Sequence, residues 1–276
     1  MPIKFYAPEW GNTLPFPTFC QRVKAAGYEG VEMALPFEEE ARQEIHETLQ
    51  TFGLELIGQY WQSNESDFEA HRQQYERYLR HLAAAEPVCI NCQTGKDYFS
   101  PIQNGQLVEL AARISAETGI RIIHETHRGK ALFAAHISRD YLRMFPDLRI
   151  TLDISHWCAV HESLLDDQAE AVDLAIARTD HIHSRVGYPE GPQVTDPFAP
   201  EWAETLRAHL GWWDRVVELH RAAGTQLTIT TEFGPAPYMP LLPFTRQPVA
   251  DQWAINVGMM NLLKARYAQD RVTNHS

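Results

Sequence analysis

Four short segments decide the fold of this chain: Ile122-Ile123-His124-Glu125, Thr151-Leu152-Asp153, His181-Ile182-His183 and Thr230-Thr231-Glu232. Each has the residue types of a β-strand, and each ends in a side chain that can bind a metal ion. The first three end residues lie 28 and 30 residues apart. That distance matches one strand, one helix and their connections. We therefore expect each end residue to occupy the same place in a repeated strand–helix unit.

The same alternation runs along the whole chain and is typical of a parallel sheet built from strand–helix units. Strands are predicted at Ile3–Ala7, Tyr28–Met33, Leu54–Gln59, Val88–Cys92, Arg121–Glu125, Arg149–Asp153, His181–Ser184 and Gln226–Glu232. Helices are predicted at Pro17–Ala26, Glu38–Phe52, Asp67–Ala85, Pro101–Glu117, Ser138–Phe145, Asp166–Ala177, Trp202–Ala223 and Val249–Ala268. Left-handed caps after four of the helices are expected at Gly27, Gly53, Gly119 and Gly224. The 276 residues thus predict an α/β fold, a single (β/α)8 barrel over residues 1–276.

The functional site of such a barrel lies at the C-terminal ends of its strands, where all four proposed ligands fall. Alternation along a strand directs those ligands into the barrel and sends their neighbours outward. The neighbours sent outward are Ile122, His124, Leu152, Ile182 and Thr231. The apolar ones suit a position under the helices, whereas His124 and Thr231 suit it less well.

Composition narrows the possible partners. The chain has 24 basic and 36 acidic residues, a net charge of −12, which disfavours binding to nucleic acid. It has no run of roughly 18 apolar residues of the kind that spans a membrane. The segment Met1–Tyr6 resembles a first strand rather than a signal segment, so we expect no membrane association and a cytoplasmic location.

The four cysteines are too few for a disulfide framework in a chain of this length. Cys89 and Cys92 form a Cys-x-x-Cys motif, which can be a redox or zinc pair. On a strand, however, positions three apart face opposite sides. Two separate thiols packed in the core are therefore favoured.

Three carboxylates and one imidazole form a fairly hard ligand set, suited to Mn²⁺, Mg²⁺, Co²⁺ or Zn²⁺. The sequence predicts one divalent metal ion, with the ligands Glu125, Asp153, His183 and Glu232. Each residue alone has a simpler explanation, because a strand-end acid often caps the next helix or pairs with arginine. Their recurrence in consecutive units favours the metal site.

These motifs resemble the xylose-isomerase-like barrel superfamily of sugar isomerases and epimerases, which also includes DNA-repair enzymes of the endonuclease IV type. The resemblance spans essentially the whole chain and rests on Glu125, Asp153 with His156 in an Asp-x-x-His segment, His183 and Glu232. In ketose epimerases of that superfamily, the glutamates matching Glu125 and Glu232 bind the metal and face each other across the substrate. One removes a carbon-bound proton and the other returns it.

The resemblance therefore implies a divalent-metal-dependent isomerase or epimerase, with Glu125 and Glu232 as catalytic residues. Its expected substrate is a small sugar or sugar-derived carbonyl compound that reacts through an enediolate. The resemblance also implies that His156 contacts substrate oxygens, although the residue can instead pack beside Trp157. Arg185 lies closer to the strand than the substrate arginine of related epimerases, so it either binds substrate or pairs with a strand-end acid.

Other side chains that follow predicted strands are expected to bind substrate: Gln59, Gln93, His127, Trp10 and Trp61. For the two tryptophans, packing at the rim is the alternative. The run His124–Arg128 suits a carboxylate, a phosphate or sugar hydroxyls, whereas Arg128 and Lys130 are equally compatible with solvated loop charges. We predict a lid or substrate loop at Gly187–Pro200 and a frayed tail at Asp270–Ser276.

Three other functions remain open. An inosose-dehydratase-like lyase would expel a hydroxyl from the same enediolate. An abasic-site endonuclease of this superfamily uses three zinc ions, but here the third and fourth strands end in Gln59 and Asn91-Cys92-Gln93, without the histidines of such a cluster. A non-catalytic binding protein would keep the barrel, with or without the metal. A homo-oligomer is also possible, since barrels of this group often pair through their loop faces.

Overall fold

A computed structural model of the protein describes residues 3–269. Eight strands form a closed barrel in which every neighbouring pair is parallel and β8 pairs with β1. The strands are β1 (Ile3–Pro8), β2 (Gly30–Met33), β3 (Glu55–Tyr60), β4 (Ile90–Cys92), β5 (Ile122–Glu125), β6 (Ile150–Leu152), β7 (Thr179–His183) and β8 (Leu227–Thr230). The predicted (β/α)8 barrel is confirmed.

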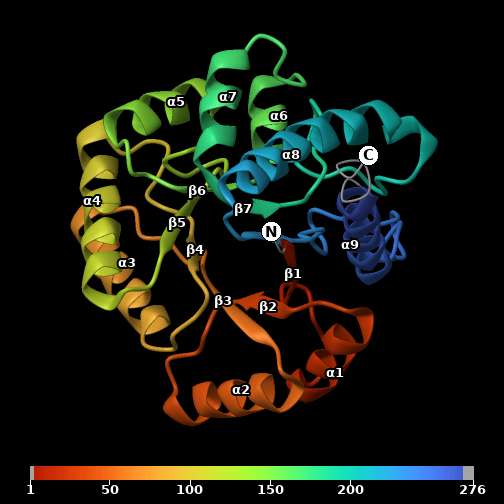
Figure 1. Cartoon of the computed structure of the whole chain (residues 1–276), viewed down its shortest axis with the longest axis horizontal. Helices are drawn as coiled ribbons and strands as arrows, with labels where there is room; N and C mark the ends of the chain where they lie inside the picture. Colours follow the sequence, from red (N-terminus) through yellow and green to blue (C-terminus); the bar gives the residue numbers. More distant parts are fainter. Residues whose placement is uncertain (1–2, 270–276) are drawn as a thin grey trace.

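The helices form a ring around the strands (Figure 1). They are α1 (Phe16–Ala26), α2 (Glu39–Phe52), α3 (Phe68–Ala83), α4 (Pro101–Thr118), α5 (Ala135–Met144), α6 (Ser155–His161), α7 (Ala169–Arg178), the 3-10 helix η1 (Pro200–Trp202), α8 (Ala203–Ala223) and α9 (Gln252–Gln269). Helix α6 was not predicted, because seven residues are too few for a recognisable helical period. It begins two residues after Asp153, so the segment after β6 turns at once into a helix.

The four predicted glycine caps are confirmed. Gly27, Gly53, Gly119 and Gly224 follow α1, α2, α4 and α8, with φ between +58° and +94°. A side chain is disfavoured at these values of φ, so glycine ends each helix at low cost.

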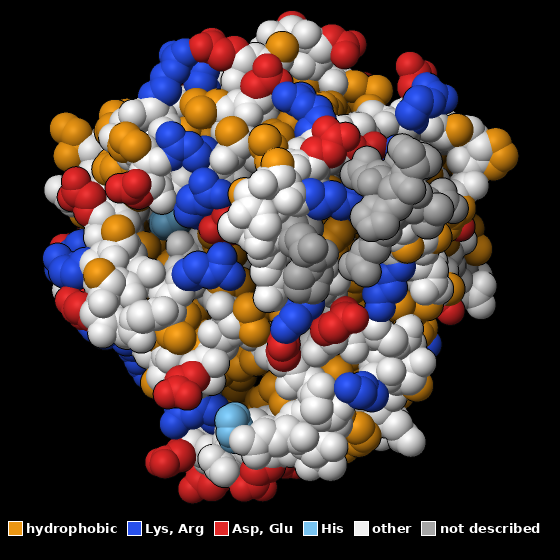
Figure 2. Space-filling model, in the orientation of Figure 1, with side chains coloured by type: hydrophobic (Ala, Val, Ile, Leu, Met, Phe, Trp, Pro, Cys, Tyr) orange, Lys and Arg blue, Asp and Glu red, His pale blue; other side chains and the backbone are white. Residues whose placement is uncertain are grey.

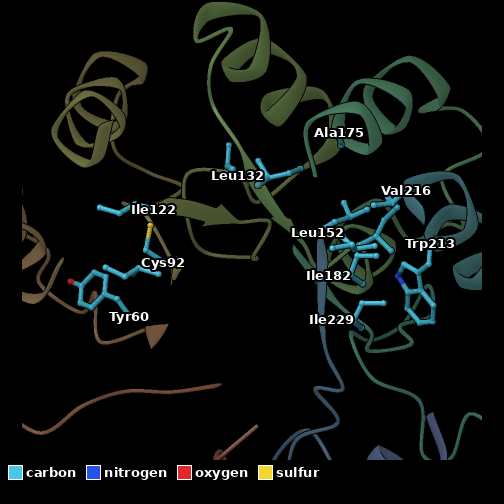
Figure 3. Close-up of a cluster of buried hydrophobic side chains, with 14 of the residues drawn as sticks. Tyr60, Cys92, Ile122, Leu132, Leu152, Ala175, Ile182, Trp213, Val216 and Ile229 are labelled. Carbon is cyan, nitrogen blue, oxygen red and sulfur yellow. The ribbon is translucent and has the colours of Figure 1, made fainter. Parts of the chain in front are cut away.

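Two layers of side chains fill the protein. On the outer side of the strands, Leu152, Ile182 and Ile229 face Trp213 and Val216 of α8 (Figure 3). Inside the barrel, a smaller cluster contains Tyr6, Ile57, Cys89 and Ile123. The outward direction predicted for alternate strand residues is therefore confirmed.

The two polar residues that alternation sends outward find polar partners there. His124 Nδ1 lies 2.7 Å from Thr94 Oγ1, and Thr231 Oγ1 lies 2.7 Å from the hydroxyl of Tyr28. Each side chain thus remains hydrogen-bonded beneath the helices, as a buried polar group requires.

The two cysteines of the Cys-x-x-Cys motif lie in different layers. Cys89 belongs to the cluster inside the barrel and Cys92 to the outer core. Both are buried and free, which confirms the prediction of two separate core thiols.

Charged side chains of both signs are mixed on the face of the molecule in Figure 2, and the excess of acid forms no single acidic surface there. Within residues 3–269, no helix has the length and apolar character needed to cross a membrane. The predicted frayed tail, residues 270–276, lies outside the described residues.

Candidate metal centre

The structure brings the four proposed metal ligands together. One ligand atom from each of Glu125, Asp153, His183 and Glu232 lies within 4.8 Å of the other three. Glu125 and His183 are the last residues of β5 and β7, while Asp153 directly follows β6 and Glu232 lies just beyond β8. All four side chains are at most 4% exposed. Their meeting follows from the parallel barrel, which places corresponding strand ends at one mouth.

The contacts within this cluster fit a bound cation. His183 Nδ1 lies 2.7 Å from Glu232 Oε2, at ion-pair distance, and neither buried atom has another hydrogen-bond partner. Buried polar atoms normally have a hydrogen-bond partner, and two that lack one while pointing to a shared position are suited to coordinate an ion. The residues present therefore fit a divalent metal.

Glu32 of β2 lies beneath the cluster and orients His183. The Oε1 and Oε2 atoms of Glu32 lie 3.0 and 3.1 Å from His183 Nε2. Its Oε2 atom also lies 3.1 Å from His181 Nε2. Thr230 donates a further hydrogen bond to it. A proton held on His183 Nε2 by Glu32 leaves the lone pair of Nδ1 free for a metal.

Two amides at the end of β4 hold Glu125. Asn91 Nδ2 donates to Glu125 Oε2 and to Glu32 Oε1, both at 2.9 Å. Gln93 Nε2 lies 3.2 Å from Glu125 Oε1. Gln93, predicted to bind substrate, is thus a direct partner of a proposed ligand. Neither Glu32 nor Asn91 was among the predicted site residues, and only the strand-end position of Glu32 pointed to the pocket.

Arg185 pairs with acids of the cluster. Its Nη2 atom donates to Asp153 and lies 3.5 Å from Glu232 Oε2, and its guanidinium lies against the ring of Tyr238, 4.7 Å from the centroid. The salt bridge considered as an alternative for this arginine is therefore present. Asp153 also accepts hydrogen bonds from the backbone and hydroxyl of Ser155.

His156 and His127 form a pair beside the cluster, with ring centroids 3.8 Å apart. His156 Nε2 accepts a hydrogen bond from Arg185, so its proton lies on Nδ1, which is buried without a partner. Burial and nearby cations hold the pKa of His156 well below its ordinary value, and burial lowers the pKa of His127 to about 3. Both imidazoles are neutral at pH 7.

The buried charges shift one another's pKa. Burial raises the pKa of Glu125 to about 8. The positive charge of His183 opposes this rise, and the negative charges of Glu232 and Asp153 add to it. Burial also disfavours ionisation of Glu232, but His183 and Arg185 hold its pKa below the ordinary value. Burial disfavours the imidazolium of His183, yet the surrounding glutamates hold its pKa well above the ordinary value.

Aromatic side chains line one side of the cluster. Trp10 meets Tyr238 edge to face, with ring centroids 5.1 Å apart. A side chain on Gly234 would come within 2.4 Å of the Trp10 ring, so this close approach requires glycine. Trp61 is 50% exposed in the loop after β3, and Gln59 is half-buried at the end of that strand.

The loop predicted as a lid, 187–200, is tied to the segment after β8. Gln193 donates to the carbonyl of Gly234 at 3.1 Å and accepts from its N–H at 2.7 Å. Val194 N also donates to Val186 O at 2.9 Å. The loop thus forms part of a hydrogen-bonded wall, and its role as a lid stays a prediction.

Lys130 is buried, so the interpretation of this residue as a solvated loop charge is wrong. It is only 8% exposed and lies in the loop that begins after Glu125. Arg128, in the same loop, lies 5.2 Å from the ring centroid of Tyr238.

Sequence comparison places the chain in a family. The profile described as xylose isomerase-like TIM barrel matches residues 20–188, more than half of the chain. The protein belongs to this family. No curated protein matches the sequence. The family shares the barrel fold, in agreement with the resemblance noted from the strand motifs.

Solved structures of similar fold include three that carry the names of enzymes. A D-allulose 3-epimerase from Methylomonas sp., in complex with D-allulose, has a TM-score of 0.63 and 15% identity, covering 96% of this chain and 97% of that one. A probable 3-DHS dehydratase from Bacillus anthracis has a TM-score of 0.58 and 17% identity, covering 94% and 98%. Endonuclease IV from Thermus thermophilus has a TM-score of 0.53 and 13% identity, covering 84% and 93%. At these identities the likeness establishes the fold alone.

Proposed function

We propose that the protein is a divalent-metal-dependent isomerase or epimerase of a small sugar or sugar-derived carbonyl compound. The observation that carries this proposal is the convergence of Glu125, Asp153, His183 and Glu232, in which His183 Nδ1 and Glu232 Oε2 have no hydrogen-bond partner outside the cluster. A bound divalent ion would polarise the carbonyl oxygen of the substrate and stabilise the charge of its enediolate.

Proton transfer is assigned in this proposal to Glu125 and Glu232. Glu125 comes from β5 and Glu232 from the segment after β8, which β6 and β7 separate in the barrel. They therefore approach the shared position from different directions. A carboxylate that binds an ion through one oxygen keeps its second oxygen for proton transfer, so one glutamate takes a proton from carbon and the other returns one.

The neighbouring side chains bind and orient the substrate. His156 carries a buried Nδ1–H without a partner, which suits a substrate hydroxyl or carbonyl oxygen. Arg185 neutralises part of the acidic charge through Asp153 and Glu232. Trp10 and Tyr238 supply apolar surface on that side of the cluster, and Gln59, Gln93, His127 and Trp61 are proposed to complete the pocket.

Deuterium exchange tests the proposed roles of the two glutamates. Protein loaded in turn with Mn²⁺, Mg²⁺, Co²⁺ or Zn²⁺ is incubated in D2O with a panel of ketoses and keto acids, and proton NMR follows the carbon-bound protons. We expect Glu125→Gln and Glu232→Gln to lower the exchange rate by about 100-fold or more, because each removes a group that transfers a proton.

The exposed Glu39 of α2 supplies the control, and Glu39→Gln should exchange like the unaltered protein. Full exchange in both glutamine variants of the site would reject the assignment.

The same spectra separate isomerisation from dehydration, since a dehydratase loses water from its substrate. Elemental analysis of the loaded protein should give about one metal ion per chain, and cleavage of an abasic oligonucleotide would instead support the endonuclease function.

A further inference from the structure

The ammonium of Lys130 is buried, and its hydrogen bonds go to neutral groups. It donates to the carbonyl oxygen of Ser63 at 3.4 Å and to the hydroxyl of the same residue, which lies in the loop between β3 and α3. Both acceptors are neutral. Within residues 3–269, no acidic side chain forms an ion pair with Lys130. Burying an ammonium in this way is costly, because neutral acceptors replace only part of its hydration.

Arg185 shows how this protein treats another buried cation. It is 1% exposed, donates to Asp153 and lies within 3.5 Å of Glu232. Lys130 is 8% exposed and, among the described residues, has no acid at ion-pair distance; Glu125 and Asp97 attract its charge from further away. The contrast indicates a position at which an anion from outside the chain can make the direct contact that no acid of the described residues makes.

A second cation lies on the neighbouring loop. Ala131 N donates to Thr94 O at 2.9 Å, which ties the loop carrying Lys130 to the loop carrying Lys96. Burial, followed by the charge of Lys96, lowers the pKa of Lys130 to about 8, against smaller opposing effects of Glu125 and Asp97. Lys96 also has no ion pair with any residue that the structure describes.

Both loops start at the candidate metal centre. The loop of Lys130 begins after Glu125, and the loop of Lys96 begins after β4, where Gln93 contacts Glu125 at 3.2 Å. A small molecule that places one end beside Glu125 therefore has two lysines within the same strand-end face of the barrel.

We propose that Lys130 and Lys96, with the hydroxyl of Ser63, form a subsite for an anionic group, a carboxylate or a phosphate, at the end of the substrate remote from the reacting carbon. The substrate class is then a sugar acid or a sugar phosphate rather than a neutral sugar. This inference rests on the proposed function for the identity of the reacting end, but its test measures binding and does not require turnover.

The test compares neutral and anionic ligands of similar size. The probes are D-fructose, D-fructose 6-phosphate, 2-keto-D-gluconate and inorganic phosphate, with affinity measured by calorimetry and the melting temperature by thermal scanning on the metal-loaded full chain. We expect either D-fructose 6-phosphate or 2-keto-D-gluconate to bind at least about tenfold more tightly than D-fructose. Lys130→Gln should abolish that preference, while Lys24→Gln, which removes an exposed charge on α1, should retain it.

Direct binding of a carboxylate to the metal would also favour an anion, but that preference would survive in Lys130→Gln. Either of two results would overturn the proposal. One is that the preference survives in Lys130→Gln. The other is that no anionic probe, including inorganic phosphate, stabilises the unaltered protein more than it stabilises Lys130→Gln. A preference for fructose 6-phosphate identifies a phosphate site, and a preference for 2-keto-D-gluconate identifies a carboxylate site.

Stability provides a second measurement that needs no ligand. Because the buried ammonium contacts only neutral acceptors, Lys130→Met should raise the melting temperature of the ligand-free protein by about 2–4 °C while weakening anion binding. A lower melting temperature together with unchanged anion binding would assign Lys130 a structural role only. Exchange of substrate protons, recorded on the same samples, reports separately on the proposed catalytic activity.

Discussion

Single residues of the site differ in how far sequence patterns predict them. Glu125 and His183 are the last residues of their strands, and such positions can be recognised from local periodicity. Glu32 also lies near a strand end, but its importance comes from His181 and His183, about 150 residues further along the chain. No local pattern predicts which strand-end acid will meet which histidine, because the partner is chosen by packing inside the barrel.

The contact between Glu32 and His183 leads to a prediction about metal affinity. Glu32→Gln should weaken binding of Mn²⁺ by about 10–100-fold, since the amide holds the imidazole in the metal-binding tautomer less firmly than the carboxylate does. Calorimetric titration of the purified protein measures this directly. Glu39→Gln, an exposed change of the same chemistry, should bind Mn²⁺ normally. Equal affinities in the two variants would show that Glu32 does not orient His183.

At the scale of elements, the strands and long helices follow from their patterns, whereas the short connections do not. Two examples are helix α6, which directly follows β6, and the loop 187–200 after β7, which is hydrogen-bonded to Gly234. Both depend on contacts between segments. Gly187 illustrates this dependence, because a side chain there would lie 2.5 Å from the backbone carbonyl oxygen of Ser155 in α6. Its requirement for glycine comes from a close approach and has no local signal.

Two glycines give a matched test of that close approach. Gly187→Ala should destabilise the protein by about 1–3 kcal/mol, because the obstructing atoms belong to the backbone of α6. Gly211→Ala in α8 should stabilise it by about 0.5–1 kcal/mol, since a methyl group there meets nothing within 4 Å and alanine favours the helix. Denaturant unfolding of both variants gives the two signs. A stable Gly187→Ala variant would exclude the contact.

The whole molecule places most of its unusual charges at one mouth of the barrel. Glu32, Glu125, Asp153 and Glu232 are all at most 4% exposed, and His183 and Arg185 lie among them as cations. Burying several like charges is unfavourable unless protons or a metal ion neutralise them. The stability of the fold is therefore linked both to pH and to metal binding.

This linkage predicts opposite pH trends for the metal-stripped protein and for metal binding. The pKa of Glu125 is about 8 in the folded protein and 4.5 in the reference state, so the folded state holds a proton that the unfolded chain has released. The raised pKa of His183 acts in the same direction. Stability contributed by these protons is lost as pH rises, and the melting temperature of the stripped protein should fall between pH 6.5 and 8.

Mn²⁺ must displace the same protons, so its affinity should rise over that interval. The pH range starts at 6.5 so that other buried histidines, such as His124, His127 and His156, do not contribute to the trend. Their lowered pKa values affect stability only below about pH 6.5. Thermal scans with EDTA and calorimetry with Mn²⁺ at several pH values measure both trends. A melting temperature and an affinity that stay constant with pH would contradict the charge distribution described for the site.

The sequence by itself determined the repeated strand–helix units, the glycine caps and the inward direction of the four proposed ligands. These features depend on periodicity and on backbone preferences, which act over a few residues. Only the tertiary structure decided that Glu32 supports His183, that Arg185 pairs with Asp153 and that Lys130 is buried against Ser63. Closure of the barrel creates these contacts between distant segments, and the cost of burying a charge then selects the partner that each one meets.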